Sequence, residues 1–288
     1  MKHFKLMMLG LALSAGFTTQ MQAQEAQSFV HQQSNTEDYI WPTDPQVLTK
    51  LKHWQDQKFG VLMHWGLYSV PGVVESWSIC SEDWIVRERK PTYEEDKAWY
   101  WSQKDSLNPV NFNPGKWADV MKKAGMKYMI FTTKHHDGFC MFDTKYTDFS
   151  IAHGPFGKDP RHNIAKEVFD AYRNKGFMIG CYFSKPDWHS KWFWNPYYAT
   201  PNRRINYKKK QHPDWWQNYR KFTQNQLNEL TTDYGNIDIL WLDGGWITGD
   251  EIGLDTILVD ARKRNPGKIS VDRTIRRKNE KYQTPEQG

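Results

Sequence analysis

The stretch ILWLDGGW, residues 239–246, combines an apolar strand with a carboxylate placed at its end. Asp243 follows the apolar residues and precedes two glycines and a tryptophan. Desolvating a carboxylate costs free energy unless the group is paired or hydrogen-bonded. Two interpretations stay open from this stretch alone. Asp243 is either a satisfied structural acid, in a helix cap or a buried ion pair, or a functional acid beside a ligand.

The same arrangement recurs along the chain as an amphipathic helix, a short apolar strand and a polar or aromatic loop. Five strands of this kind are predicted, in residues 59–66, 127–139, 177–184, 237–245 and 268–273. Each follows a predicted helix, in residues 45–57, 114–125, 162–176, 215–235 and 254–267. Strands joined by helical crossovers pair in parallel, and continuous apolar runs fit strands covered on both faces.

Polar residues gather where each predicted strand ends. They are His64 and Trp65, the run His135, His136 and Asp137, then Tyr182, Asp243, and the pair Asp272 and Arg273. Such residues at the carboxyl ends of parallel strands are typical of (β/α)8 barrel enzymes. A doubly wound open sheet would place its ligand at the same ends, but the glycine-rich phosphate loop that usually accompanies it is missing from the sequence.

The number of strands limits this fold assignment. A complete barrel needs about 250 residues and eight strands, whereas five β/α units are predicted here. The sequence therefore predicts an α/β fold of the (β/α)8-like TIM barrel type that is incomplete in this chain. We expect the chain to be a truncated form or a natural fragment of a longer enzyme.

The amino terminus resembles a secretory signal. Lys2 and Lys5 precede an apolar run, and MQA at residues 21–23 forms a plausible cleavage site before Gln24. The apolar run is too short to span a bilayer comfortably. A lipid anchor is not indicated, because no cysteine lies near the cleavage site. We expect residues 1–23 to be removed, residues 24–38 to be flexible, and residues 39–288 to form the catalytic barrel domain of an exported, periplasmic or secreted protein.

Composition and charge argue against a nucleic-acid-binding protein and against a disulfide-rich one. The 288 residues carry a formal net charge of +6, and the lysine run at 208–210 has no nucleic-acid recognition motif beside it. A solvated surface is therefore the favoured interpretation of that run. Cys80, Cys140 and Cys181 lack CxxC spacing, so no disulfide framework is expected, although one cysteine pair stays open.

Adjacent histidines follow the second predicted strand. If the strand continued, His135 and His136 would point to opposite faces, so a shared metal would need a local turn. Neutral imidazoles both donate and accept hydrogen bonds, so we interpret the pair as hydroxyl-binding groups. His64 occupies the same place on the first strand. No cluster at metal-ligand spacing surrounds Asp243 in the sequence, which favours direct carboxylate chemistry over a metal.

The surroundings of Asp243 also suggest a ligand. Gly244 and Gly245 leave room beside the carboxylate, and Trp241 and Trp246 can form walls. Two long aromatic and charged loops, residues 80–101 and 185–204, would overhang the same strand ends. They are interpreted either as subsites for the leaving group or as lids and core-covering segments.

Seven motifs occur in one order: MHWGLYSVPG, ESWS, TTKHHDGFCMFDTKYTDF, GCYFSKPDW, ILWLDGGW, SVDR and TPEQ. In this combination, from about Trp54 to the last residue, the chain resembles the retaining alpha-L-fucosidases of glycoside hydrolase family 29. The resemblance implies a (β/α) barrel hydrolase that removes terminal alpha-L-fucose from a fucosylated oligosaccharide or glycoconjugate without a metal or other cofactor.

The resemblance also implies roles for individual residues. Asp243 matches the nucleophile, and Glu286 in TPEQ is the candidate acid/base. The residues implied to hold fucose are His64, Glu75, Trp77, His135, His136, Tyr182, Trp241 and Arg273. One motif departs from the family, which more often has adjacent Glu and Trp where Ser76 separates Glu75 from Trp77 here. A retaining glycosidase needs two carboxyl groups about 5 Å apart.

Three other hypotheses stay open. The predicted barrel is incomplete, so the chain could bind fucose without hydrolysing it. It could also be a degraded fragment without a biochemical role. Finally, a barrel hydrolase could act on a different sugar, which a comparison of aryl glycosides would reveal.

Overall fold

The computed structural model describes residues 42–81, 90–199 and 202–273. Its five strands form one sheet in the order β1-β2-β3-β4-β5, with every neighbouring pair parallel. The strands are β1 (Gly60–Met63), β2 (Tyr128–Lys134), β3 (Met178–Ser184), β4 (Ile239–Asp243) and β5 (Ile269–Val271). The predicted α/β class and the five β/α units are confirmed.

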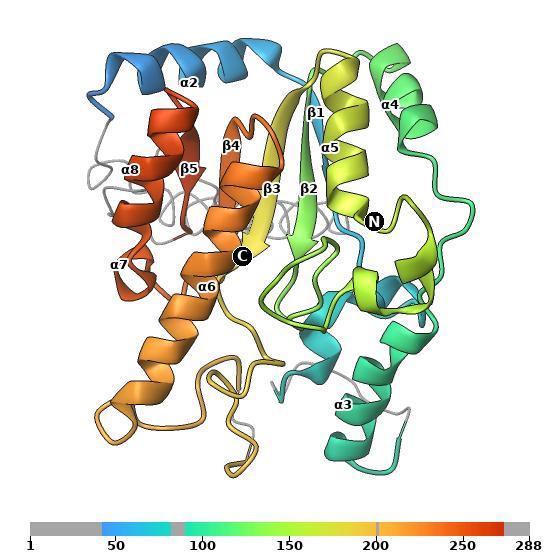
Figure 1. The fold of residues 1–288 in the computed structure, drawn as a ribbon, viewed down its shortest axis with the longest axis vertical. Coiled ribbons are helices and arrows are strands. Elements are labelled where there is room, and N and C mark those ends of the chain that lie inside the picture. Colours follow the sequence, from blue (N-terminus) through green and yellow to red (C-terminus); the bar gives the residue numbers. More distant parts are fainter. Residues whose placement is uncertain (1–41, 82–89, 200–201, 274–288) are drawn as a thin grey trace, which may run out of the picture.

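Helices precede and separate the strands, as Figure 1 shows. They are α2 (Pro45–Gln57), α3 (Tyr93–Ser102), α4 (Pro114–Lys123), α5 (Ile164–Asn174), α6 (Pro213–Asp233), α7 (Gly249–Ile252) and α8 (Leu254–Arg264). Short 3-10 helices lie in the loops: η2 (Leu67–Ser69), η3 (Glu75–Ile79), η4 (Gln103–Asp105), η5 (Ile151–His153) and η6 (Pro155–Lys158).

Side-chain caps explain where the predicted helices begin. The side chain of Asp44 accepts from two backbone amides of α2, and the side chains of Asn113 and Asn163 each accept from one amide of α4 and α5. α3 was not predicted, although its start carries a capping box in which Thr92 and Glu95 bond reciprocally. That spacing of Thr and Glu is a recognisable helix start.

The alternation of side chains along each strand divides the core into two clusters. Cys181, Phe183 and the leucines of β4 lie in a large cluster. On the other face, Tyr182, Ile239 and Val271 form a small cluster with residues of α2. Figure 1 shows α2 across the amino-terminal ends of the strands, so the small cluster is closed at that end. The carboxyl ends of the strands lie at the opposite end.

Strand register decides which site residues share a face. Thr132 pairs with Tyr182, Tyr182 with Trp241, and Ser184 with Asp243. The β2–β3 ladder shifts between Thr132 and Lys134, and β2 ends there. The strand predicted over residues 127–139 is therefore shorter, and the histidines that follow it lie in a turn.

Two other expectations concern the chain as a whole. All three cysteines are buried and free, so the pair left open by the sequence is not formed. Within the described ranges, no helix is both long and apolar enough to cross a bilayer. The predicted signal at residues 1–23 and the flexible segment at residues 24–38 lie outside the described residues.

Candidate active site

Asp243 lies at the carboxyl end of β4, where three polar side chains approach its carboxylate. The Tyr182 hydroxyl donates to Oδ2 at 2.5 Å. Arg273 Nε lies 3.5 Å from Oδ1, and His136 Nε2 lies 3.8 Å from Oδ2. Parallel register delivers the tyrosine, since β3 and β4 are neighbours with the same strand direction. The carboxylate is thus approached by groups from three different segments.

These neighbours keep Asp243 ionised. Burial by itself would raise the pKa of the carboxyl group, but His136, the Tyr182 hydrogen bond and Arg273 outweigh it and lower that pKa to about 2. Burial and the adjacent carboxylate raise the pKa of Tyr182 well above its ordinary value. The phenol therefore keeps its proton and acts as a donor to Asp243.

The histidines expected at the site converge on the same space. The rings of His135 and His136 lie 4.3 Å apart, and His64 packs edge-on against His135 at 5.5 Å and Tyr182 at 4.8 Å. The two adjacent imidazoles do not point to opposite faces, because β2 has already ended at Lys134. The local turn that the sequence made a condition for shared chemistry is present.

A hydroxyl group fixes the orientation of each imidazole through its Nδ1 atom. The hydroxyl partners are Thr132 for His64 at 2.6 Å, Ser184 for His136 at 2.5 Å, and Ser76 for His135. With Nδ1 engaged, each Nε2 atom is directed to the carboxylates of the site. Sequence reasoning missed these three hydroxyl residues, and only strand register and loop conformation bring them to their partners.

The protonation state of His136 follows from its hydroxyl partner. Ser184 Oγ donates its single proton to the Pro186 carbonyl at 2.8 Å, so His136 Nδ1 must donate to Ser184. Burial and the neighbouring His135 lower the pKa of His136 well below its usual value. The same two causes lower the pKa of His64 to about 4. Both rings are therefore neutral at neutral pH, and His136 Nε2 is an acceptor facing Asp243.

Glu75 supplies a second carboxylate, close to two histidines. Its oxygens lie 3.3 Å from His135 Nε2 and 3.9 Å from His64 Nε2. The hydrogen bond with His135 is the largest influence and lowers the pKa of Glu75, against the effect of burial. Ser76, the extra residue of the ESW motif, is fully buried and bonds to His135. The departure from the family motif thus places a hydroxyl behind the imidazole.

A cavity of about 530 Å³ opens beside Asp243. It is lined by Trp77, His136, Asn202, Arg203, Arg204, Asp243, Gly245, Trp246 and Arg273. The Arg203 guanidinium lies 4.9 Å from the Trp77 ring and 5.3 Å from the Trp246 ring, in cation–π contact with both. The sequence did not single out Arg203, because nothing in a charged loop distinguishes one arginine from the next.

The structure places Trp241 and the two glycines in different surroundings near Asp243. Trp241 packs against the small core cluster and does not line the cavity. Gly244 has φ 84°, and a Cβ there would lie 2.2 Å from Pro186 Cδ. A Cβ on Gly245 would lie 2.5 Å from the Arg273 carbonyl oxygen. The room beside the carboxylate is therefore largely filled by protein, although Gly245 also lines the cavity.

Backbone strain is concentrated at the site. Among the described residues, three that are not glycine have positive φ, and two of them are Glu75 at 43° and Arg273 at 56°. Such conformations cost about 1–3 kcal/mol each and persist where the surroundings impose them. Both residues present charged groups to the histidines or to Asp243.

Two groups of side chains have donor atoms close enough to hold a metal ion. They are His64 with Glu75 and His135, and His135 with His136 and Asp243, each with its atoms within 4.8 Å. The sequence spacing gave no sign of either group, since the members come from different strands. The same converging nitrogen and oxygen atoms also fit the hydroxyl groups of a sugar, each of which donates and accepts.

Of the residues expected at the site, Glu286 alone lies outside the described residues. Asp137 of the HHD run is bound by Tyr100 at 2.5 Å and by the Phe139 amide at 3.1 Å, and burial raises its pKa. Asp137 is thus a structural acid. The remaining candidates form one contiguous group around Asp243 and Glu75, except that Trp241, which is partly buried, packs against the small core cluster.

Three comparisons relate the chain to known proteins. A sequence model described as alpha-L-fucosidase matches residues 26–288. Human plasma alpha-L-fucosidase is 30% identical over 211 residues, which cover 68% of this chain and 40% of that protein. Thus the chain spans well under two thirds of this curated relative.

Solved structures agree with the sequence comparison. Alpha-L-fucosidase isoenzyme 1 from Paenibacillus thiaminolyticus is 32% identical with a TM-score of 0.61, over 78% of this chain and 50% of that one. A family 29 alpha-L-fucosidase from Bacteroides thetaiotaomicron, a mutant trapped as a covalent intermediate with 2-fluoro-fucosyl fluoride, is 31% identical with a TM-score of 0.60. The similarity covers 82% of this chain and 50% of that structure.

Proposed function

The chain belongs to the alpha-L-fucosidase family, and from this premise we propose that it hydrolyses terminal alpha-L-fucose from glycans by a retaining double displacement. The observation that carries the proposal is Asp243, an ionised carboxylate held beside a cavity by a tyrosine, a histidine and an arginine. A nucleophilic carboxylate must be ionised and oriented before it can attack an anomeric carbon.

In the first step, Asp243 attacks the anomeric carbon while the bond to the leaving oxygen breaks. The product of this step is a fucosyl ester of Asp243, which water then hydrolyses in the second step. The Tyr182 hydroxyl donates to Oδ2, so Oδ1 on the Arg273 side is the oxygen left for attack. Arg273 and Tyr182 together maintain the anionic form that the first step needs.

Fucose recognition is assigned to the three imidazoles and to Glu75. The Nε2 atoms of His64 and His135 face Glu75, and that of His136 faces Asp243. A sugar hydroxyl between Glu75 and His64 or His135 can donate to the carboxylate and accept from a protonated Nε2 atom, whereas His136 Nε2, an acceptor, takes a hydrogen bond from a hydroxyl. The Trp77 ring, which lines the cavity and packs at 5.1 Å on His136, provides an apolar surface for the methyl group or ring face of fucose.

The acid/base role is proposed for Glu286. This second carboxyl group must carry a proton near neutral pH in order to protonate the leaving oxygen. Glu75 does not suit that role, because its contact with His135 lowers the pKa of the carboxyl group. Glu75 is therefore excluded as the proton donor, and Glu286 is proposed for that role from the family resemblance.

The decisive experiment compares hydrolysis of an aryl alpha-L-fucoside by the chain and by Asp243→Ala, with Asp148→Ala as the control. Asp148 is 95% exposed at its side chain and distant from the site in sequence. We expect turnover that disappears in Asp243→Ala and persists in the control. Azide added to Asp243→Ala should restore turnover and release fucosyl azide of inverted configuration. Undiminished hydrolysis by Asp243→Ala would refute the assignment, and fucose binding without turnover would support a binding fragment instead.

We also propose that the protein is exported and that residues 39–288 act as the catalytic domain. Support comes only from the sequence features of residues 1–23, with their positive start, apolar run and small-residue cleavage site. Amino-terminal sequencing of the protein expressed in a bacterial host tests this proposal. A mature chain that begins at Gln24 is expected, and a chain that keeps residues 1–23 would contradict it.

A further inference from the structure

A second cavity, of about 510 Å³, lies next to the Asp243 cavity. Its lining is rich in aromatic and polar side chains: Glu94, Lys97, Trp101, Trp188, His189, Lys191, Trp194, Asn195, Pro196, Tyr197, Tyr198 and Ala199. The lining comes from α3, which lies mostly within residues 80–101, and from the loop at residues 185–204. For both segments the sequence left a subsite and a lid as alternatives. Nothing in the proposed hydrolysis of the fucosyl bond uses this cavity.

A row of tryptophans separates the two cavities. Trp77 lines the first cavity and contacts Trp188 at 5.4 Å, and Trp188 stacks on Trp194 at 5.0 Å with an interplanar angle of 4°. Trp188 is fully buried and Trp194 is 6% exposed, so the row is a packed wall between the cavities. A glycan that leaves the first cavity must pass over this wall to reach the second.

One loop also connects the two cavities through hydrogen bonds. The Trp188 indole donates to the Arg203 carbonyl at 3.2 Å, and the Trp194 indole donates to the Arg204 carbonyl at 2.9 Å. Arg203 and Arg204 line the first cavity, whereas Trp188 and Trp194 line the second. The position of one cavity relative to the other is thus fixed by the loop itself.

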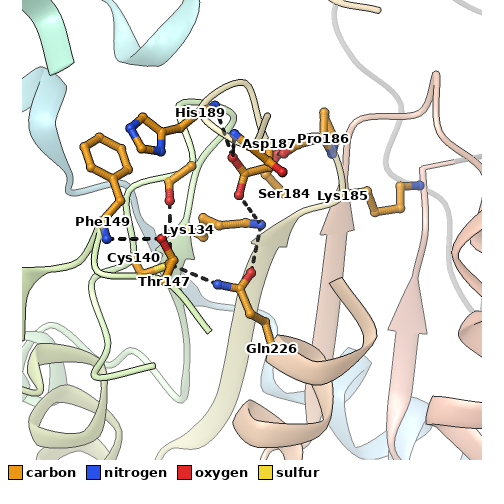
Figure 2. Close-up of polar contacts among 12 residues, drawn as sticks. Lys134, Cys140, Thr147, Phe149, Ser184, Lys185, Pro186, Asp187, His189 and Gln226 are labelled. Carbon is orange, nitrogen blue, oxygen red and sulfur yellow. Dashed lines mark hydrogen bonds and ion pairs between the residues drawn. The ribbon is translucent and has the colours of Figure 1, made fainter. Parts of the chain in front are cut away.

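His189 is presented to the second cavity by its neighbours. Its ring stacks on Phe149 at 3.7 Å and meets Trp101 edge-on at 5.2 Å, and its backbone amide donates to Asp187 at 3.1 Å. Figure 2 shows the His189 and Phe149 rings beside each other, above the buried contact of Lys134 with Asp187. No side chain or backbone group of the described residues hydrogen-bonds to the His189 ring nitrogens, so they are available to a ligand.

Two tyrosines add exposed aromatic surface at the same place. Tyr197 is 87% exposed and Tyr198 is 45% exposed. The segment is nevertheless held in place, because Asn206 donates to the carbonyls of Asn195 and Tyr198 at 2.8 and 3.1 Å. Exposed rings on a fixed backbone, with polar groups between them, suit a ligand that has apolar faces and many hydroxyl groups.

We propose that the second cavity is a carbohydrate-binding subsite that holds the sugars on the leaving-group side of the fucosidic bond. The His189 ring nitrogens bind a hydroxyl group, and Trp101 and the two tyrosines contact apolar sugar faces. The assignment of this cavity to the leaving-group sugars rests on the proposed function. Carbohydrate binding at the cavity can nevertheless be measured without hydrolysis.

The first measurement is binding of two fucose-free disaccharides, N,N′-diacetylchitobiose and lactose, to the 288-residue chain by ligand-observed NMR titration. His189→Phe keeps the ring stacking and removes the hydrogen-bonding nitrogens, and Tyr198→Ala removes one exposed ring. Phe59→Ala is the control, since Phe59 is 49% exposed and precedes β1 at the opposite end of the sheet. We expect at least one disaccharide to bind, with Kd raised about three- to tenfold in His189→Phe and in Tyr198→Ala and unchanged in Phe59→Ala.

The second measurement separates this inference from the proposed function. KM is compared for an aryl alpha-L-fucoside, whose leaving group is too short to reach the second cavity, and for a fucosylated chitobiose oligosaccharide. His189→Phe is expected to raise KM for the oligosaccharide alone. Disaccharide binding that responds to the substitutions, in a chain without fucosidase activity, would refute the proposed function and support the subsite. Binding of neither disaccharide below a Kd of about 10 mM, or binding that ignores both substitutions, would overturn the subsite.

Discussion

At the scale of single residues, Tyr182 decides the state of Asp243. Its hydroxyl is the shortest recorded contact of the carboxylate, at 2.5 Å, and burial keeps the phenol protonated by raising its pKa. A hydrogen bond to an ionised acceptor is worth about 1.5–3 kcal/mol. The tyrosine therefore both lowers the pKa of the nucleophile and fixes which of its oxygens faces the sugar.

Replacing Tyr182 by phenylalanine should lower kcat for an aryl alpha-L-fucoside by about 10- to 100-fold, because the carboxylate loses its donor. Tyr172→Phe is the matched control, since the buried Tyr172 hydroxyl finds no hydrogen-bond partner among the described residues and lies on α5, away from the site. Steady-state kinetics of both variants provide the measurement. Equal kcat values for Tyr182→Phe and the unsubstituted chain would show that the contact has no part in catalysis.

His64 gives the site a pH-dependent stability with a defined sign. Its pKa is about 4 in the folded chain and about 6.5 when unfolded. As the pH falls from 6.5 to 4, the unfolded chain binds a proton that the folded chain refuses, so the free energy of unfolding decreases. The side chain is 28% exposed, which reduces the effect.

His64→Gln should remove this contribution. Between pH 7 and pH 4.5, the unsubstituted chain is expected to lose about 2 kcal/mol more unfolding free energy than the variant. Urea denaturation at the two pH values measures the difference. Parallel losses in the two proteins would show that His64 titrates in the folded state as it does in the unfolded chain.

The acid and the histidines of the site were predictable from the sequence, but the hydroxyl residues that orient the histidines were not. Asp243 and the histidines could be found because acids and imidazoles stand out after apolar strands. Ser76, Thr132 and Ser184 look like ordinary polar residues, and their role depends on register and loop conformation. The assignment of Glu286 stays a prediction.

At the scale of elements, a buried ion pair joins the end of β2 to the loop after β3. Lys134 Nζ lies 3.1 Å from Asp187 and donates to Gln226 of α6 at 3.1 Å, with the pair 0% and 2% exposed (Figure 2). The Asp187 carboxylate in turn accepts from the amides of His189 and Ser190. The pair thus connects three elements just behind the histidines.

Lys134→Met should lower the free energy of unfolding by about 3–5 kcal/mol, because it leaves a buried carboxylate without its cation. The double variant Lys134→Met with Asp187→Asn should recover part of that loss. The matched control is Lys145→Met, whose ion pair with Asp233 is 74% and 46% exposed and which should leave stability unchanged. Denaturant unfolding compares the three variants. A loss for Lys134→Met no larger than for Lys145→Met would contradict the account.

The loop after β4 depends on glycine at position 244. Gly125 and Gly244 have nearly the same φ, 87° and 84°, but a Cβ on Gly125 meets nothing within 4 Å, whereas one on Gly244 meets Pro186. Gly125→Ala should therefore cost about 1 kcal/mol from backbone strain alone, and Gly244→Ala a further 1–3 kcal/mol from the clash. Urea unfolding of both variants measures these costs. Equal losses of unfolding free energy in the two variants would show that Pro186 moves away from the added Cβ at no cost.

Element prediction succeeded where caps and periodicity agree and failed where a local interaction overrides them. The boundaries of α2 were predicted to the residue, since Asp44 and Pro45 are strong start signals. The strand over residues 127–139 was predicted too long, because the ladder shift after Thr132 leaves no trace in composition. α3 was overlooked although its capping box could have been found.

At the scale of the whole molecule, strand order brings the site together. Parallel strands place all their carboxyl ends at one edge, so residues from His64 to Arg273 meet there, while α2 closes the opposite end of the small cluster. The sequence supports this architecture because repeated helix–strand units allow few other arrangements. The lining of the cavities was not predictable in detail, since it combines a strand end, α3 and loop residues that only the tertiary structure brings together.

The central claim is that Asp243 of this chain is a nucleophile that forms a fucosyl ester. The most direct measurement is intact-mass analysis after incubation with 2-fluoro-fucosyl fluoride, followed by peptide mapping of the product. The account predicts one 2-fluoro-fucosyl group per chain, attached to Asp243 and missing in Asp243→Ala. A label on another residue, or no label on the folded chain, would contradict it.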